Sequence, residues 1–591
     1  MTLITVISRH LSHLTPIIFE FKKKVDTHII ITDEDKEYKE KTEELYNGIK
    51  RLNKKYNLKP KIKIFVIDED DKSDFNKLFL KLKKIIKSKI YLNINEADTT
   101  FTILISAFVF KNKGKIISYD KNDNTYNLIS QDKIQNHIIK NNMKIDDYMI
   151  LLDYKIETKT IATDIIDRKE DILKIGKPKI LKKIKNLLIR NAIHSKYEKE
   201  LKNLKIVKNN KINNSAAGNI FEEYLFWEFY QYDIDDIALN IRIISDIKSK
   251  TLITNEFDIL MIKDNHIFVV EAKFGSLIYN STKAKVSNDI IYKADSLLSL
   301  FGEDSKTLVV NITKENIFSH NALVRAKSLN IDIYQNTSLD SLYKKVQEHF
   351  NIKKRAFLLG GMDLEMAEIE NILKKYNQIV FNKNLNWGAK LSSYKNQRKK
   401  DYHFYGIELI EDIQPPKNYT KIDHHNEFYK KPSSIEQIAK LLNIKLNRYQ
   451  KLVALNDKGY IPAMEKFGAT KEEIESIRQK DRFYQGVTKE DEKLAKESLK
   501  NIEIINNIKI IYALCDKFSA ISDRIYPTKD YIIYNDKKII FYGNIKPLIK
   551  IFNNLIKENK AYYGKNFFGI VENVFTKEEI KKIKQKGLQA L

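Results

Sequence analysis

The sequence has very little cysteine and no long hydrophobic run. Cys515 is the single cysteine among 591 residues, which excludes an internal disulfide and leaves too few thiolates for a cysteine-based zinc site. Such a low cysteine content is typical of proteins in a reducing compartment, so we expect a cytoplasmic protein. No stretch of about 18 apolar residues occurs, so we expect no membrane span. The first residues lack the plan of a signal peptide, and no repeat of fixed period is present.

The remaining composition is typical of folded, basic domains. Hydrophobic residues make up 43% and aromatic residues 11%, which excludes a largely disordered chain. The length predicts about three or four domains. The formal net charge is +26, which favours polyanionic partners such as nucleic acid or nucleotides. The richness in Lys, Ile and Asn is equally typical of an AT-rich genome, so charge alone identifies no ligand.

The pattern of hydrophobic residues predicts an α/β multidomain protein. Strand-like runs (LITVIS, THIIITD, KIKIFVID and KIYLNIN) alternate with amphipathic helical stretches near the N-terminus, which indicates a parallel sheet. A basic helical run follows, and then a helix, a hairpin and further α/β units. The predicted blocks are residues 1–150, a helical connector at 151–215, a second α/β domain at 216–350, a third at 355–485 and a small C-terminal α/β domain at 486–591.

A predicted hairpin at residues 255–274 (NEFDILMIKDNHIFVVEAKF) carries charges where an interior strand is expected. Asp264–Asn265 suits a two-residue turn, and counting outward from this turn places Asp258 opposite Glu271. Side chains alternate along a strand, so Glu271 and Lys273 share one face. The side chains of Asp258, Glu271 and Lys273 are therefore predicted to converge near one end of the hairpin.

Two neighbouring carboxylates repel each other unless a cation lies between them. A hard divalent ion, Mg²⁺ or Mn²⁺, meets this need through oxygen ligands, and Lys273 would then steady the attacking water or the charged transition state. Glu222, on the preceding helix GNIFEEYLFWEFYQY, would complete the metal shell, with Glu223 as the adjacent alternative. The other interpretation is a surface hairpin with a cross-strand ion pair, since an acid-x-Lys pattern alone is common.

Glu222, Asp258, Glu271 and Lys273 match the PD-(D/E)xK nuclease pattern in the form E…D…E-A-K. The words FEEYLFWEFYQY, NEFDIL, VVEAKF, NDIIYKAD and NALVRAKSLNIDI resemble the CARF-domain nucleases of type III CRISPR defence, and the resemblance covers most of residues 1–345. It implies a Rossmann-like CARF sensor that binds a cyclic oligoadenylate and a PD-(D/E)xK α/β core. It also implies a homodimer that cuts DNA, RNA or both with a metal ion.

For the N-terminal block the resemblance implies a Ser or Thr after the first strand, which TVISRH supplies. It also implies a glycine-rich, lysine-containing loop after a later strand, where backbone N–H groups approach phosphate. The loop here, NINEADTT at residues 93–100, lacks glycine and lysine and carries two acids, which disfavours phosphate. Phosphate-ligand sensing and a block that serves only dimerisation both stay open. The candidate ligand-binding residues are Ser8, Arg9, Asn93, Asn95 and Thr99.

Metal-binding residue types gather at predicted strand ends in the third block. The segment KIDHHNEF places an acid and two histidines after one strand, and imidazole with carboxylate favours Mn²⁺ or a similar ion. Other acids follow predicted strands in LLGGMDLEM, FYGIELIED and VALNDKGYI, at the edge where open α/β sheets bind ligands. The predicted ligands are Asp363, Glu365, Glu408, Asp423, His424, His425 and Asp457, with Glu411 and Asp412 as rivals of Glu408.

This pattern resembles the DHH phosphoesterase family over residues 355–480, followed by a DHH-associated domain. The segment AYYGKNFFGI at residues 561–570 resembles the substrate loop of that domain, with fewer glycines. The family hydrolyses phosphodiesters with two Mn²⁺ ions and begins with a His-x-Asp-x-Asp motif. Here GMDLE lacks the His and has Glu365 in place of the second Asp. One metal site is therefore expected to be altered or lost, and a purely structural DHH-type domain stays the alternative.

Three functions agree with these patterns. In the first, the N-terminal block gates a nuclease, and the DHH-like domain hydrolyses a phosphodiester such as the activating cyclic oligonucleotide. In the second, a constitutive nucleic-acid-processing enzyme has two hydrolytic centres and needs no activator. In the third, the chain binds nucleic acid without catalysis. The third ranks last because all four nuclease positions hold usable chemistry.

Overall fold

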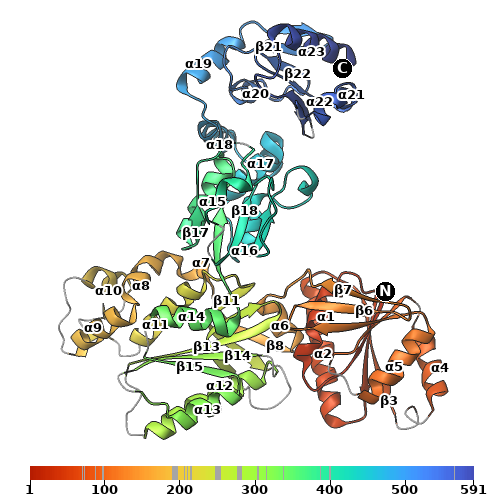
Figure 1. The fold of residues 1–591 in the computed structure, drawn as a ribbon, viewed down its shortest axis with the longest axis vertical. Helices are drawn as coiled ribbons and strands as arrows, with labels where there is room; N and C mark the ends of the chain where they lie inside the picture. Colours follow the sequence, from red (N-terminus) through yellow and green to blue (C-terminus); the bar gives the residue numbers. More distant parts are fainter. Residues whose placement is uncertain are drawn as a thin grey trace. The chain divides into compact units, whose positions relative to one another are not determined.

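The computed structural model divides the chain into two compact units, Met1–Arg355 and Ala356–Leu591 (Figure 1). Among the residues it describes, no helix is long and apolar enough to cross a membrane. The described residues are 1–68, 71, 74–86, 88–95, 99–189, 197–204, 207–208, 211–212, 216–245, 254–275, 282–302, 305–313, 316–336, 339–386, 388–397, 401–558, 560–564 and 566–591.

A seven-stranded sheet in the order β3-β2-β1-β4-β5-β6-β7 begins the first unit. Strands β1 to β5 are parallel, as predicted, and β6 and β7 add an antiparallel edge. Successive side chains pack on opposite faces: Ile30 lies with helices α1 and α2, whereas Ile29 and Ile31 lie with α4 and α5. The elements are β1 (Thr2–Val6), α1 (Thr15–Phe21), β2 (Thr27–Asp33), α2 (Lys36–Lys55), β3 (Lys61–Ile67), α4 (Phe75–Ile85), β4 (Ile90–Asn93), α5 (Thr99–Lys111), β5 (Lys115–Asp120), β6 (Thr125–Ile129), β7 (Ile134–Ile138) and α6 (Ile145–Leu151).

A six-stranded sheet in the order β15-β14-β13-β12-β11-β8 completes the first unit. Strands β8, β11, β12 and β13 are antiparallel neighbours in that order, whereas β13, β14 and β15 run parallel with helices between them. Helices α12 and α13 lie together against the β14–β15 part of the sheet (Figure 1). The elements are α11 (Ala216–Phe229), β11 (Asp236–Ser245), β12 (Thr254–Lys263), β13 (His266–Gly275), α12 (Lys283–Ser299), β14 (Lys306–Thr313), α13 (His320–Ser328), β15 (Ile331–Gln335) and α14 (Leu339–Phe350).

The segment expected to be a helical connector, residues 151–215, starts with a strand instead. Strand β8 (Tyr154–Thr160) pairs with β11 and forms one edge of the six-stranded sheet. Its sequence YKIETKT alternates with period two, a strand pattern that the basic composition conceals. Helices and a short two-stranded ribbon follow in the described part of this segment. They are α7 (Ala162–Ile165), α8 (Lys169–Ile175), α9 (Pro178–Ile189), α10 (Glu198–Asn203), β9 (Val207–Lys208) and β10 (Lys211–Ile212).

The seven-stranded and six-stranded sheets of the first unit share one hydrophobic core. Ile17 of α1 belongs to the same buried cluster as Leu260 of β12 and Val269 of β13. The ring of Tyr148 on α6 meets that of Phe301, just after α12, edge to face at 6.2 Å between centroids. The hairpin β12–β13 is therefore packed directly against the N-terminal part of the chain.

The second unit contains two sheets. A four-stranded sheet, β17-β16-β18-β19, comes first, and a six-stranded sheet, β20-β21-β22-β23-β25-β24, follows. Both agree with the predicted α/β character of the two C-terminal blocks. The elements that position the site are β16 (Lys354–Leu358), α15 (Leu364–Lys375), β17 (Ile379–Phe381), β18 (Tyr402–Ile407), β19 (Tyr419–Ile422), α16 (Ser434–Leu441), α17 (Arg448–Lys466) and α18 (Lys471–Tyr484). The remaining elements are α19 (Lys489–Ser498), β20 (Glu503–Ile505), β21 (Ile508–Tyr512), α20 (Ser519–Ile525), β22 (Tyr531–Tyr534), β23 (Ile539–Tyr542), α21 (Lys546–Ile551), α22 (Asn553–Lys557), β24 (Ala561–Tyr563), β25 (Phe567–Ile570) and α23 (Lys577–Ala590).

Candidate functional sites

The closed end of the hairpin has the register that the sequence predicts. Strands β12 and β13 pair from the turn as far as Ile259↔Val270. Both turn residues, Asp264 and Asn265, have positive φ, 50° and 66°, as a type I′ turn requires. The predicted turn chemistry therefore sets the pairing of the strands.

The ladder ends before it reaches Asp258 and Glu271. Beyond Val270, β13 remains paired with β14 on its other side, and Asp258 Oδ2 accepts the backbone N–H of Ala272 at 2.8 Å. The expected cross-strand pair is thus replaced by a side-chain contact. The charged groups nevertheless meet, because Lys273 Nζ lies 3.2 Å from Asp258 Oδ2 and 3.1 Å from Glu271 Oε2.

Glu271 is the most deeply buried of these groups, with a side chain 2% exposed. Its Oε1 atom is buried without a hydrogen-bond partner among the described residues. Burial acts to lower the pKa of Lys273, but Glu271 and Asp258 outweigh it and the pKa is raised. Lys273 is therefore a permanent cation that bonds Oε2 of Glu271, while Oε1 stays available to a further positive group.

Glu222, rather than Glu223, faces this site. Burial raises the pKa of Glu222 to about 7, and the negative charges of Asp258 and Glu271 add to the effect. The neighbouring Glu223 carboxylate instead pairs with Arg168 at 2.9 Å. Burial also raises the pKa of Glu223 to about 7, but its charged neighbour is that arginine. The helix α11 thus directs one glutamate to the hairpin and the other away from it.

Lys293 is a member of the site that the sequence analysis does not predict. Its Nζ lies 2.8 Å from Glu271 Oε2, so this oxygen receives two ammonium groups. The residue belongs to α12, the crossover helix between the parallel strands β13 and β14. The only signal in the sequence is the position of Lys293 in the segment NDIIYKAD. A lysine on an amphipathic helix does not otherwise indicate a functional site.

The donor set fits a divalent cation. Asp258, Glu271 and Glu222 offer carboxylate oxygens, the ligands that Mg²⁺ and Mn²⁺ prefer. The Oε1 of Glu271 has no hydrogen-bond partner among the described residues, and the pKa of Glu222 is raised first by burial and then by the charge of Asp258, so a cation between these carboxylates would relieve both effects. These carboxylates are the groups that would hold a metal ion.

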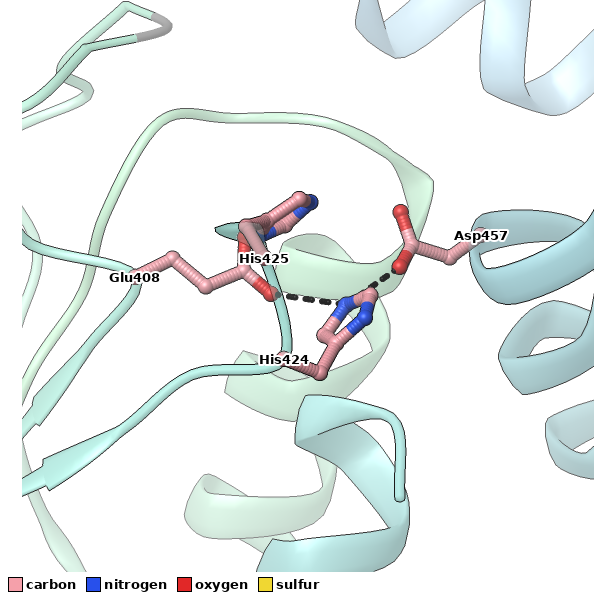
Figure 2. A group of neighbouring side chains, drawn as sticks. All are labelled: Glu408, His424, His425 and Asp457. Atoms are coloured by element: carbon pink, nitrogen blue, oxygen red, sulfur yellow. Dashed lines mark ion pairs between the residues drawn. The ribbon is translucent and has the colours of Figure 1, made fainter. Parts of the chain in front are cut away.

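A second cluster of metal-binding residue types lies in the second unit (Figure 2). One ligand atom from each of Glu408, His424, His425 and Asp457 lies within 4.8 Å of the others. Glu408 follows β18, and the two histidines follow β19, as predicted. Asp457, predicted at a strand end, lies instead within helix α17.

His424 is at the centre of this cluster. Its Nε2 lies 2.5 Å from Asp457 Oδ2 and 3.5 Å from Glu408 Oε1 and from Glu365 Oε2. Burial acts to lower the pKa of His424, but these carboxylates raise it to about 12. None of the four facing atoms makes a hydrogen bond of good geometry among the described residues. Three carboxylates around one imidazole, without aligned hydrogen bonds, form a donor set that suits Mn²⁺ or a similar ion.

The other predicted ligands hold this cluster in place. Asp363 caps α15 by accepting the N–H of Met366 at 2.8 Å, and Glu365 Oε1 accepts the N–H of Ile435 at 3.0 Å. Burial, with Glu408 and Asp457 nearby, raises the pKa of both acids. Asp423 Oδ1 bonds the backbone N–H and Nδ1 of His425, which orients that ring.

Asp423 stays ionised in this arrangement. Burial acts to raise its pKa, but the hydrogen bonds from His425 and the charge of Lys421 lower it to about 2. The rivals of Glu408 lie outside the cluster. Both are exposed, and the carboxylate of Asp412 accepts the N–H of Ser392 at 2.9 Å.

The candidate ligand-binding residues of the N-terminal block gather at one edge of its sheet. Strands β1 and β4 are parallel neighbours, and Ser8 and Asn95 follow their carboxyl ends. Asn93 is buried. Its Nδ2 donates to the backbone oxygen of Leu14, just before α1, at 3.3 Å, and its Oδ1 accepts a hydrogen bond from the side-chain amide of Asn95. Arg9 and Thr99 are exposed at the same edge. The two acids of the loop, residues 96 and 98, lie outside the described residues.

Comparisons with known proteins agree with the middle of the chain. Residues 210–353 match the Card1-like endonuclease domain, and no curated protein matches in a sequence search. Protein VC1899 from Vibrio cholerae is 15% identical, with a TM-score of 0.47, over 59% of this chain and 98% of that one. Can2 from Sulfobacillus thermosulfidooxidans, solved with cyclic tetra-adenylate, is 14% identical, with a TM-score of 0.46, over 59% of this chain and 99% of that one. The region from 210 to 353 is therefore similar to a CRISPR-associated endonuclease domain, which supports a phosphodiester hydrolase activity.

Proposed function

We propose that the chain is a metal-dependent nuclease of type III CRISPR-like antiviral defence, in which a cyclic oligoadenylate bound by the N-terminal block controls cleavage of DNA or RNA. The observation that carries the nuclease proposal is the carboxylate of Glu271. It is buried, one of its oxygens is unpartnered, and Asp258, Glu222 and two lysines surround it.

The residues of this site have different roles in the proposed phosphodiester hydrolysis. Asp258 and Glu271 would hold Mg²⁺ or Mn²⁺, which when bound supplies an activated water and neutralises charge on the phosphate. Glu222 would complete the shell of the metal ion, and its pKa of about 7 without metal lets it ionise when the cation binds. Lys273 is held by three acceptors, Asp258 Oδ2, Glu271 Oε2 and Ala272 O at 3.2 Å. Its ammonium group would stabilise the negative charge that develops on the phosphate.

The edge that carries Ser8 and Asn95 supports the sensor proposal. Along the sheet, β1 lies between β2 and β4, so the strand order reverses between β1 and β4. Open α/β sheets bind ligands at the carboxyl ends of strands at such a point. The exposed Arg9 supplies a cation for a phosphate group at this edge. A homodimer, which the proposal includes, would also cover the exposed apolar side chains Leu80 and Ile103 on α4 and α5.

Tyr119 supports gating over a constitutive enzyme. Its backbone N–H bonds Asn95 Oδ1 at 2.7 Å, and its hydroxyl bonds Asn124 Oδ1 at 3.0 Å and Asp264 O at 3.5 Å. Asp264 is in the turn of the hairpin whose other end carries the catalytic groups. A displacement of Asn95 by a ligand would therefore reach the catalytic hairpin through one side chain. Tyr119→Phe is expected to weaken activation by a cyclic oligoadenylate while the protein still binds it.

The second unit supports a second activity, hydrolysis of a phosphodiester with Mn²⁺. The cluster of Glu408, His424, His425 and Asp457 carries this proposal. Its substrate would be a nucleic-acid end or the activating cyclic oligonucleotide. Hydrolysis of the activator would make the second unit a timer that ends the nuclease activity. Loss of His424 would then prolong nuclease activity after a pulse of activator, and equally rapid switching-off in that variant would refute the timer.

One experiment separates the functions. Purified protein is incubated with Mn²⁺, a mixed set of DNA and RNA substrates and a panel of cyclic oligoadenylates, and both substrate and activator are followed. Glu271→Ala should abolish nucleic-acid cleavage alone, and His424→Ala should abolish only the loss of the cyclic compound. Full cleavage without any activator would establish the constitutive enzyme. Equal behaviour of parent and both variants would establish a binding protein without catalysis.

A further inference from the structure

Helices α12 and α13 present a basic surface beside the proposed nuclease site. Their apolar residues, such as Ile291 and Ala326, pack on β14 and β15, which leaves the opposite sides of both helices to solvent. Cations outnumber acids on these two helices, which favours a polyanionic partner. The cations are Lys283, Lys285, Lys293, Arg325 and Lys327, and the acids are Asp289 and Asp295.

An exposed aromatic ring lies within this basic surface. Tyr292 is 56% exposed, which is unusual for a ring on a helix that packs well on its other side. Arg325 Nη1 donates to the Tyr292 hydroxyl at 3.3 Å and to Asn288 Oδ1 at 3.4 Å. The guanidinium of α13 thus holds the hydroxyl of the α12 tyrosine by polar contact, while more than half of the residue stays open to solvent.

Lys293 joins this surface to the carboxylates. It directly follows Tyr292 in α12, its side chain is 48% exposed, and its Nζ lies 2.8 Å from Glu271 Oε2. The ammonium group is half in solvent, so a phosphate beside the carboxylates can contact it from the open side. The basic surface therefore extends from Tyr292 to the proposed site of cleavage.

We propose that Tyr292, Lys293 and Arg325 hold a single-stranded segment of nucleic acid next to the phosphate that is cut. One base would stack on the Tyr292 ring, and adjacent phosphates would contact Lys293 and Arg325. Proteins that bind single strands combine aromatic rings and cations in this way. A protruding ring can stack on an unpaired base but not on a base inside a duplex, which selects the single strand. The link to cleavage rests on the proposed nuclease function, whereas the binding does not.

Binding is measured on the full chain in EDTA, by fluorescence anisotropy of labelled single-stranded DNA and RNA oligonucleotides at several salt concentrations. Tyr292→Ala is expected to weaken binding about tenfold, the effect of losing one stacked base. Tyr292→Phe keeps the ring and should bind like the parent. Arg325→Ala and Lys293→Met should each lower the slope of log affinity against log salt by about 0.7. Lys344→Ala, at an exposed lysine of α14 in the same unit, is the control for loss of one positive charge.

The outcomes separate this inference from the nuclease proposal. If Tyr292→Ala and Arg325→Ala bind both oligonucleotides as tightly as Lys344→Ala does, the surface is not the binding site, whether or not the parent cleaves. If the two variants lose binding but the parent cleaves no substrate, the surface is confirmed as the binding site and the nuclease proposal fails. A duplex that competes as well as the single strand would overturn the stacking argument.

Discussion

Replacing Glu222 by glutamine should stabilise the metal-free protein above neutral pH and change little in acid. The fold raises the pKa of this carboxyl from 4.5 to about 7, first by burial and then through Asp258. The folded state therefore holds the proton more tightly than the unfolded state does. Below about pH 4.5 both states are protonated, and the group has no net effect on stability. As pH rises to about 7 the unfolded state gains from ionisation while the folded state does not, so stability falls.

The size of this loss follows from the shift in pKa. A change from 4.5 to about 7 corresponds to about 3 kcal/mol at high pH, since each unit is worth about 1.4 kcal/mol. Partial exposure of the side chain screens the charge, so we expect about 2 kcal/mol. Glutamine carries no charge, so Glu222→Gln should recover this amount at about pH 8 and none of it at about pH 4. Added Mn²⁺ should reverse the order, because the carboxylate is a ligand and a ligand that binds only the folded state stabilises it.

The assay is chemical denaturation in EDTA, read from tryptophan fluorescence. The chain has two tryptophans, and Trp227 is fully buried on α11, the helix that carries Glu222. A Trp387→Phe background therefore reports on this part of the first unit. Glu348→Gln, at an exposed glutamate of α14 in the same unit, is the matched control for the loss of one carboxylate. A Glu222→Gln protein that is less stable than the parent at about pH 8 without metal would refute the placement of Glu222 among the carboxylates.

Three further substitutions test the two centres. Lys273→Met should slow single-turnover cleavage by about a hundredfold or more, with little change in oligonucleotide binding; cleavage at the parental rate would exclude Lys273 from the reaction. Gly360→Ala should weaken Mn²⁺ binding in calorimetry, because its Cβ would lie 2.5 Å from Ile407 O and 3.0 Å from Glu408 O and would displace Glu408; unchanged affinity would show that the strand end adapts. Asp457→Asn should lower Mn²⁺ affinity at least about tenfold, whereas Asp412→Asn should not; equal affinities would exclude the helix-borne carboxylate as a ligand.

The hairpin could be predicted from sequence because its determinants are local. Asn and Asp tolerate positive φ, so Asp264–Asn265 selects a tight turn. The turn then fixes the register, and alternation fixes which side chains share a face. The same local rules predict the strands of the N-terminal sheet. What they miss is the end of the β12–β13 ladder after Ile259↔Val270, where the side chain of Asp258 accepts the backbone N–H of Ala272. On its other side β13 pairs with β14, a strand more than thirty residues further along the chain that the turn does not specify.

Lys293 is not predicted as a site residue, and Asp457 is predicted as a ligand but at a strand end, because each reaches its site from a helix. A helix carries polar residues at every turn, so periodicity separates a buried face from a solvent face but does not single out one polar residue. For Asp457 a local signal was present. Asn447 and Gln450 form a capping box at the start of α17, and this pattern predicts a helix rather than a strand before VALNDKGYI. The residue would then be placed on a helix, but its approach to His424 depends on how α17 packs on the sheet.

The bonds around the second cluster predict how many metal ions it takes. Asp363 is engaged as the cap of α15, and Asp423 bonds His425 at 3.1 Å and Lys421 at 3.3 Å. Among the described residues, the remaining donors converge on His424 as one compact group. The segment GMDLE, which carries Asp363 and Glu365, contains no histidine that could add a ligand. We therefore expect calorimetric titration to find a single tight Mn²⁺ in the second unit, lost in His424→Ala. Two tight ions would mean that Asp363 and Asp423 leave their present bonds to serve as ligands.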